Sequence, residues 1–254
     1  MMVLGRAFGI PIRVDRSWFI SFALVASSLA LVYFPRALPS APPVVDWAWG
    51  VGSALLLFVC LVAHELAHAL TAQRYGIRVE SVTLHLLGGV SQMGEEPSTP
   101  RAELLIATAG PVMSFALAGM AFGARAIASG PVSVLVLFGY VGAANLVIAV
   151  FNLLPGYPLD GGRLVRASLW AWRGSVDWAT RVASTIGRVT GLMLAGFGAA
   201  NAAAGGELIG GLWLVMVGIF VHQSARAAGR LAEIRERPAP VEVEQIEEHD
   251  VSSV

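Results

Sequence analysis

Six long apolar stretches alternate with short polar segments along the chain. They cover residues 17–34, 51–72, 104–126, 132–154, 182–204 and 208–225. An α-helix rises about 1.5 Å per residue, so about 20 apolar residues cross the roughly 30 Å hydrocarbon core of a bilayer. The pattern therefore predicts an all-α, multi-pass membrane protein with six transmembrane helices.

The basic side chains are distributed unevenly between the predicted loops. The chain has no lysine, and all 17 basic side chains are arginines. Fourteen of them lie before the first span, in the loops after the second and fourth spans, and in the C-terminal tail, whereas the alternate loops hold two, Arg36 and Arg125. The remaining one, Arg188, lies near the cytoplasmic start of the fifth span. Arginine-rich loops stay in the cytoplasm. We therefore expect a plasma or inner-membrane protein with both termini in the cytoplasm.

Two segments outside the spans have their own character. Residues 76–94 are too short to cross a membrane, and their β-branched and apolar residues around Gly88 and Gly89 are typical of strands. We expect a small membrane-associated β-hairpin between the second and third helices, with a short interfacial connector as the alternative. The chain becomes polar and acidic near its end. We expect a membrane domain over residues 1–231 and an acidic cytoplasmic tail over residues 232–254.

Composition excludes several classes of protein. Hydrophobic residues make up 56% of the chain, charged residues 13%, and the mean hydropathy is +0.69. These values exclude a cytosolic enzyme with one buried core. The single cysteine, Cys60, excludes a disulfide framework and a cysteine-based zinc cluster. The formal net charge is zero, so nothing indicates a nucleic-acid partner.

Three ionisable side chains lie together inside the second apolar stretch. His64 and His68 are four residues apart, which places both imidazoles on one helical face, and Glu65 follows the first. Histidines at this spacing can share one zinc ion while the glutamate acts as general base. Ionisable groups inside a span are costly and are usually functional. The motif therefore predicts a metal site with hydrolytic chemistry.

A catalytic zinc normally has three protein ligands. The second and fourth spans both run inward, so Asp160, just after the fourth, arrives on the same side as the two histidines. Proline residues end the helix there, and Gly161 and Gly162 allow the backbone to turn. Asp160 is the best candidate for the third ligand. Pro-Gly and Asp-Gly-Gly are also ordinary turn sequences, which is the alternative explanation.

At this point the chain resembles the site-2 protease family of intramembrane zinc metalloproteases, peptidase family M50. The resemblance rests on His-Glu-Leu-Ala-His at residues 64–68, and on Asn-Leu-Leu-Pro at 152–155 followed by Leu-Asp-Gly at 159–161. It covers roughly residues 1–225. The PDZ insert of some members is absent between the spans, so the chain is most similar to the compact, cytoplasm-facing bacterial and archaeal branch.

The resemblance implies a role for each matching residue. One zinc ion per chain would be bound by His64, His68 and Asp160, with Glu65 as the general base. Asn152 would lie near the site and hold substrate or the oxyanion.

Two further matches are weaker. Gly88 and Gly89 look like the family's glycine pair in a strand near the active site, where an unwound substrate could add as a further strand. Residues 110–114 are similar to the family's Gly-Pro-x-x-Asn, but Ser114 stands where the family has asparagine.

We therefore predict a metalloendopeptidase that cleaves transmembrane segments of membrane-anchored proteins near the cytoplasmic face, in regulated intramembrane proteolysis. Its expected partners are the lipid bilayer and a protein substrate with a transmembrane helix, while a regulatory membrane protein and a homo-oligomer stay open. Two alternatives remain. One is a membrane metalloprotease of the prenyl-protein or heat-shock type, whose third ligand is a later glutamate or histidine. The other is a metal-ion transporter or channel that uses the same side chains.

Overall fold

The computed structural model describes residues 1–86, 88–206 and 208–236, and most of these residues are helical. Within this part of the chain, five helical segments are long and apolar enough to cross a membrane: Trp18–Ala37, α3 (Pro43–Arg74), α4 (Pro100–Ile127), α5 (Val132–Asn152) and α7 (Val176–Ala203). The first consists of α1 (Trp18–Ser28), a π-helical turn (Leu29–Tyr33) and α2 (Phe34–Ala37). These five overlap the first five predicted spans, and the predicted ends at residues 17, 154 and 204 lie one or two residues outside the observed segments.

Two further helices complete the described chain. The short α6 (Asp160–Arg173) ends at Gly174, whose positive φ is the left-handed conformation that favours glycine. The long α8 (Leu208–Glu236) contains the sixth predicted span but is not among the five membrane-length segments. The predicted boundary at residues 231 and 232 falls inside α8, and residues 237–254 of the predicted tail lie outside the described residues.

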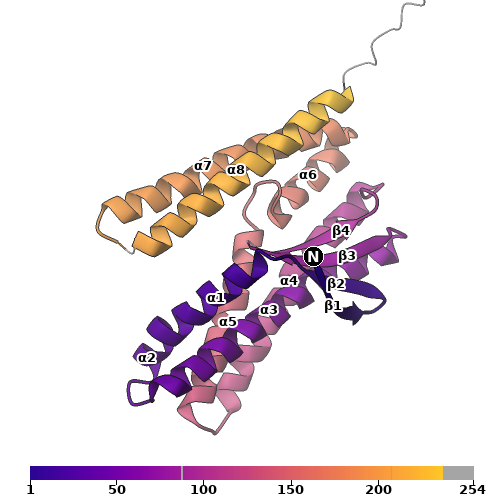
Figure 1. The fold of residues 1–254 in the computed structure, drawn as a ribbon. Helices are drawn as coiled ribbons and strands as arrows, with labels where there is room; N and C mark the ends of the chain where they lie inside the picture. The colour runs from indigo at the N-terminus through magenta and orange to yellow at the C-terminus, as the bar shows by residue number, and fades with distance from the viewer. Residues whose placement is uncertain (87, 207, 237–254) are drawn as a thin grey trace, which may run out of the picture.

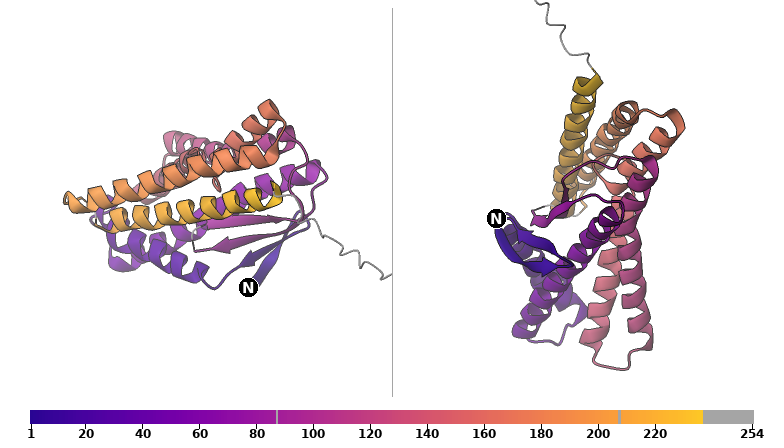
Figure 2. Two further views of the ribbon diagram at one scale, coloured as in Figure 1. Left: turned by 90° about the horizontal axis from the view of Figure 1, so that it is seen from above. Right: turned by 90° about the vertical axis from the view of Figure 1, so that its right-hand side faces the viewer.

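The helices form two groups that meet at α6 (Figure 1). In one group, α1, α3, α4 and α5 pack together; in the other, α7 and α8 run side by side in opposite directions, as the view from above also shows (Figure 2). Glycines bring α7 and α8 close, because a Cβ at Gly191 would lie 2.6 Å from the carbonyl oxygen of Gly218. The helix α6 packs against α4 on one side and α7 on the other. It therefore joins the two groups.

The strands form one sheet rather than a lone hairpin. Its order is β1 (Met2–Ala7), β2 (Ile10–Val14), β3 (Val79–His85), β4 (Gly88–Met93). The outer pairs are antiparallel, while β2 and β3 are parallel. The predicted hairpin segment thus supplies β3 and β4, and the N-terminal residues add two strands that we did not predict. Ile10 and Val82 pack on Ala69 and Ala72 of α3, which fixes the sheet beside that helix.

Candidate metal centre

The helix α3 carries both histidines on its buried face. His64 is 2% exposed and His68 is 3% exposed, and their ring centroids lie 4.9 Å apart. This closeness follows from the four-residue spacing, which brings side chains one above the other on a helix. Glu65 is also buried, next to the pair.

Asp160 reaches the histidines because the chain reverses tightly between α5 and α6. A Cβ on Gly161 or Gly162 would collide with backbone atoms of residues 153–157, so only glycine permits this approach. The reversal starts α6 at Asp160, which is 8% exposed. Burial raises the pKa of this carboxyl, but its contacts with the two imidazoles outweigh burial and hold the pKa below its ordinary value.

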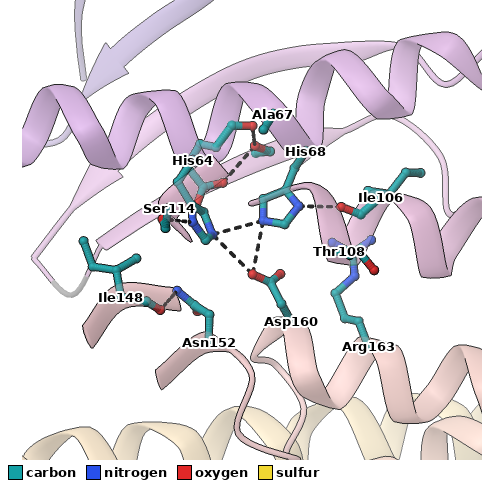
Figure 3. A network of polar contacts seen from close by, with 12 residues as sticks. His64, Ala67, His68, Ile106, Thr108, Ser114, Ile148, Asn152, Asp160 and Arg163 are labelled. Carbon is teal, nitrogen blue, oxygen red and sulfur yellow. Dashed lines mark hydrogen bonds and ion pairs between the residues drawn. The ribbon is translucent and has the colours of Figure 1, made fainter. Parts of the chain in front are cut away.

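The three side chains present their ligand atoms to one point. Asp160 Oδ2 lies 3.2 Å from Nε2 of His64 and 3.2 Å from Nε2 of His68, and the two nitrogens are 3.2 Å apart. Figure 3 shows the three groups converging from α3 and α6. Ligands about 2.0–2.1 Å from a tetrahedral zinc ion lie about 3.3 Å from one another. The triangle therefore has the size that a zinc ion needs.

The opposite nitrogen of each imidazole is already engaged. His64 Nδ1 lies 2.8 Å from the hydroxyl of Ser114, and His68 Nδ1 lies 2.6 Å from the carbonyl oxygen of Ile106 (Figure 3). A carbonyl oxygen only accepts, so His68 carries its proton on Nδ1 and leaves the lone pair of Nε2 for a metal. Gly110 faces both Nε2 atoms so closely that a Cβ there would occupy their space.

Strand β4 lies against Glu65. The Ser91 hydroxyl is 2.8 Å from Oε2 of Glu65 and 3.0 Å from its backbone carbonyl oxygen. A Cβ on Gly89 would lie 2.5 Å from Glu65 Cγ, so the strand can approach this closely only with glycine there. Our sequence analysis identified Gly89 but missed Ser91. The signal for Ser91 was its place two residues after the glycine, on the same face of the strand.

Asn152 and Gly88 are not brought into the group of three ligands. The Asn152 amide donates a hydrogen bond of 3.0 Å to the carbonyl oxygen of Ile148, within its own helix (Figure 3). Gly88 pairs with His85 at the turn of the β3–β4 hairpin and has a φ of +140°. The substrate roles expected for these two residues stay predictions.

Buried charges fix α6 against α4 behind the three ligands. Arg166 Nε donates a hydrogen bond of 2.7 Å to Oε1 of Glu103, a carboxylate that is fully buried. The network extends outward, because Glu96 lies 3.6 Å from Arg166 and 3.0 Å from Arg235 of α8. Burial raises the pKa of Glu96, but the hydrogen bond from Arg235 and the charge of Arg166 lower it by more than burial raises it, so the net shift is downward.

The chain is similar to proteins that are named as metalloproteases. The chain is 45% identical over 227 residues to Rip3 of Mycobacterium tuberculosis and 36% identical over 240 residues to sll0528 of Synechocystis, each named "Putative zinc metalloprotease". These alignments cover 88% and 92% of this chain but 57% and 61% of the relatives, so the chain spans about three fifths of their length.

A solved structure extends the likeness to the fold. The site-2 protease from Methanocaldococcus jannaschii is 27% identical, with a TM-score of 0.63, over 95% of this chain and 97% of that one. Residues 52–131 and 120–194 match the family described as Peptidase family M50, and together they make up more than half of the chain. The chain therefore belongs to peptidase family M50, the site-2 protease family.

Proposed function

We propose that this protein is an intramembrane zinc metalloendopeptidase that cleaves transmembrane segments of membrane-anchored proteins near the cytoplasmic face. The observation that carries the proposal is the buried triangle of two imidazole nitrogens and one carboxylate oxygen, with sides of 3.2 Å, beside a glutamate on a membrane-length helix. Two histidines and a glutamate inside an apolar helix are energetically costly and are usually kept for a function.

His64, His68 and Asp160 would hold the zinc ion. The donor set supports this assignment, because two imidazoles and a carboxylate are ligands that zinc prefers and the second nitrogen of each imidazole is engaged elsewhere. When bound, zinc supplies a Lewis acid that polarises the scissile carbonyl and makes water more acidic. Asp160 would bind the ion as a carboxylate, the form whose oxygens present only lone pairs.

Glu65 is the general base in this proposal. Its carboxylate would accept a proton from the attacking water and return it to the leaving amine of the cleaved peptide. Ser91 holds this carboxylate at 2.8 Å, so the side chain is oriented before substrate arrives. Asn152 would assist substrate or the oxyanion after its amide leaves the carbonyl oxygen of Ile148.

The substrate would add to the sheet as an extended strand. A peptide bond within a helix has its carbonyl hydrogen-bonded, so the segment must unwind before attack. In the sheet order β4 is an edge strand, and it lies next to Glu65 through Gly89. An unwound segment paired with β4 at Gly88 and Gly89 would regain its backbone hydrogen bonds close to the general base.

The proposed topology has six spans, with α8 as the sixth and both termini in the cytoplasm. The support is the arginine distribution along the sequence and the antiparallel packing of α7 and α8, which have 28 and 29 residues (Figure 1). The four strands and α6 would then lie at the cytoplasmic side with the active site. In this scheme residues 1–231 form the membrane protease domain and residues 232–254 an acidic tail. The substrate, and any regulatory protein or second copy, would approach within the bilayer.

Zinc content and cleavage, measured on the same purified samples, test the proposal. We expect one zinc per chain and cleavage of a single-span substrate by the wild type. Glu65→Gln should keep zinc and lose cleavage, while Asp160→Ala should lose both. The exposed Glu95→Gln is the matched control and should behave as wild type. Metal-dependent ion flux in proteoliposomes without any cleavage would contradict the proposal in favour of a transporter.

A further inference from the structure

A basic cavity lies between the beginning of α7 and the end of α8, away from the metal ligands. Its volume is about 640 Å³. Figure 1 shows these two helix ends side by side near α6. Four arginines and one glutamate line it, together with Trp178 and Thr185: Arg181, Arg188, Arg226, Arg230 and Glu233. The cavity therefore has an excess of positive charge.

The arginines converge because of their spacing on the two helices. On α7, Arg181 and Arg188 are seven residues apart, which is about two helical turns and places them on one face. On α8, Arg226 and Arg230 are four residues apart, on one face as well. These two faces meet across the cavity, so charges from separate segments surround one volume.

Three of these arginines have no acidic partner among the residues that the structure describes. Neither Arg188, Arg226 nor Arg230 forms an ion pair there, although Glu233 lines the same cavity. The Arg188 guanidinium donates a hydrogen bond of 2.9 Å to the hydroxyl of Thr185, which orients it. Positive side chains that outnumber the one acidic side chain in a concave site favour an anionic ligand.

The cavity lies where an apolar helix surface changes to a polar one. Beyond Arg188, α7 exposes Leu192 and Met193 at 60% and 70%, and before Arg226, α8 exposes Ile219 and Phe220 at 47% and 46%. These exposed apolar side chains are typical of a lipid-facing surface. The change from apolar to basic residues marks the depth of lipid headgroups, which is also where tryptophan is enriched.

We propose that this cavity binds the phosphate headgroup of an anionic phospholipid, with the acyl chains lying along the exposed apolar faces of α7 and α8. Guanidinium groups match phosphate by paired hydrogen bonds as well as by charge. Basic pockets between membrane helices on the cytoplasmic side bind such headgroups in other proteins. An acidic peptide would satisfy the charge, but it would not use the adjoining apolar surface.

Native mass spectrometry of the full chain in detergent tests this proposal, with dioleoyl phosphatidylglycerol and dioleoyl phosphatidylcholine as probes. We expect retention of the anionic lipid over the zwitterionic one. The double variant Arg188→Gln/Arg230→Gln should bind the anionic lipid on the order of 25-fold more weakly, from roughly fivefold for each arginine near a membrane surface. The variant Arg188→Lys/Arg230→Lys should recover part of this loss, because it restores the charge but not the paired hydrogen bonds of the guanidinium groups.

The control is Arg74→Gln/Arg101→Gln, which removes two exposed arginines outside the cavity. It should bind the lipid as wild type does. Equal loss of lipid binding in the control and cavity variants would overturn the proposal, because it would show that the general surface charge, and not the cavity, holds the lipid. Displacement of the lipid by a synthetic peptide of residues 237–254, or binding of inorganic phosphate with no preference between the two lipids, would also overturn it. Normal zinc content in each variant verifies that the fold is intact.

Discussion

Removal of the Ser114 hydroxyl should weaken zinc binding while the fold persists. Ser114 is fully buried, and its oxygen lies 2.8 Å from Nδ1 of His64. In Ser114→Ala the imidazole loses this partner, and a buried donor left without one costs about 1–3 kcal/mol. Loss of a hydrogen bond behind a metal ligand typically lowers metal affinity about 10–100-fold, which corresponds to about 1.4–2.7 kcal/mol. The two estimates overlap.

The assay is competition between the purified protein and a zinc chelator, which gives the dissociation constant directly. Ser114→Thr keeps a hydroxyl and should keep most of the affinity. Ser168→Ala is the control, because Ser168 is an exposed serine of α6 whose hydroxyl bonds to the carbonyl oxygen of Leu164. If Ser114→Ala bound zinc as tightly as the wild type and this control, then Ser114 would not orient His64 and the reasoning would be refuted.

Three more perturbations test other parts of the site. Gly89→Ala should push strand β4 away from Glu65, the proposed general base, and reduce cleavage without zinc loss; undiminished turnover would contradict the packing described. Glu103→Gln should lower the free energy of unfolding by about 3–5 kcal/mol, measured by thermal unfolding in detergent, because it removes the buried carboxylate that Arg166 hydrogen-bonds and leaves only the half-exposed Glu96 as a charged neighbour. The pKa of Glu96 is lowered in the folded protein, so its contact with Arg235 stabilises the fold above the ordinary pKa of a glutamate. This stabilisation is lost as the pH falls through the lowered pKa. Spin labels on α8 and on the β4–α4 loop should therefore move apart in acid, whereas a constant distance between them would refute this.

Some features of the site could be predicted from local sequence alone. The pairing of His64 and His68 needs only a helix, because four-residue spacing fixes their relative position. The approach of Asp160 needed topology as well, since two spans in the same direction end on the same side of a membrane. The glycines that follow Asp160 permit the tight reversal that the structure has.

Other features could not be predicted because they depend on contacts between distant segments. Strands β1 and β2 join β3 through a parallel pairing of residues that are about 70 positions apart, and no local pattern specifies such a partner. Likewise, the hydroxyl of Ser91 meets Glu65 only because β4 packs on α3. The cavity between α7 and α8 depends on which faces of two helices meet.

The sequence by itself therefore determined the succession of long apolar helices and the placement of His64 and His68 on one helical face, because hydropathy and helical spacing are local properties of a chain. Only the tertiary structure decided that Asp160 Oδ2 lies 3.2 Å from both imidazoles, that Ser114 and Ile106 engage their second nitrogens, and that four strands form one sheet. These contacts arise where separate elements pack, and packing is set by the shapes of all the side chains together.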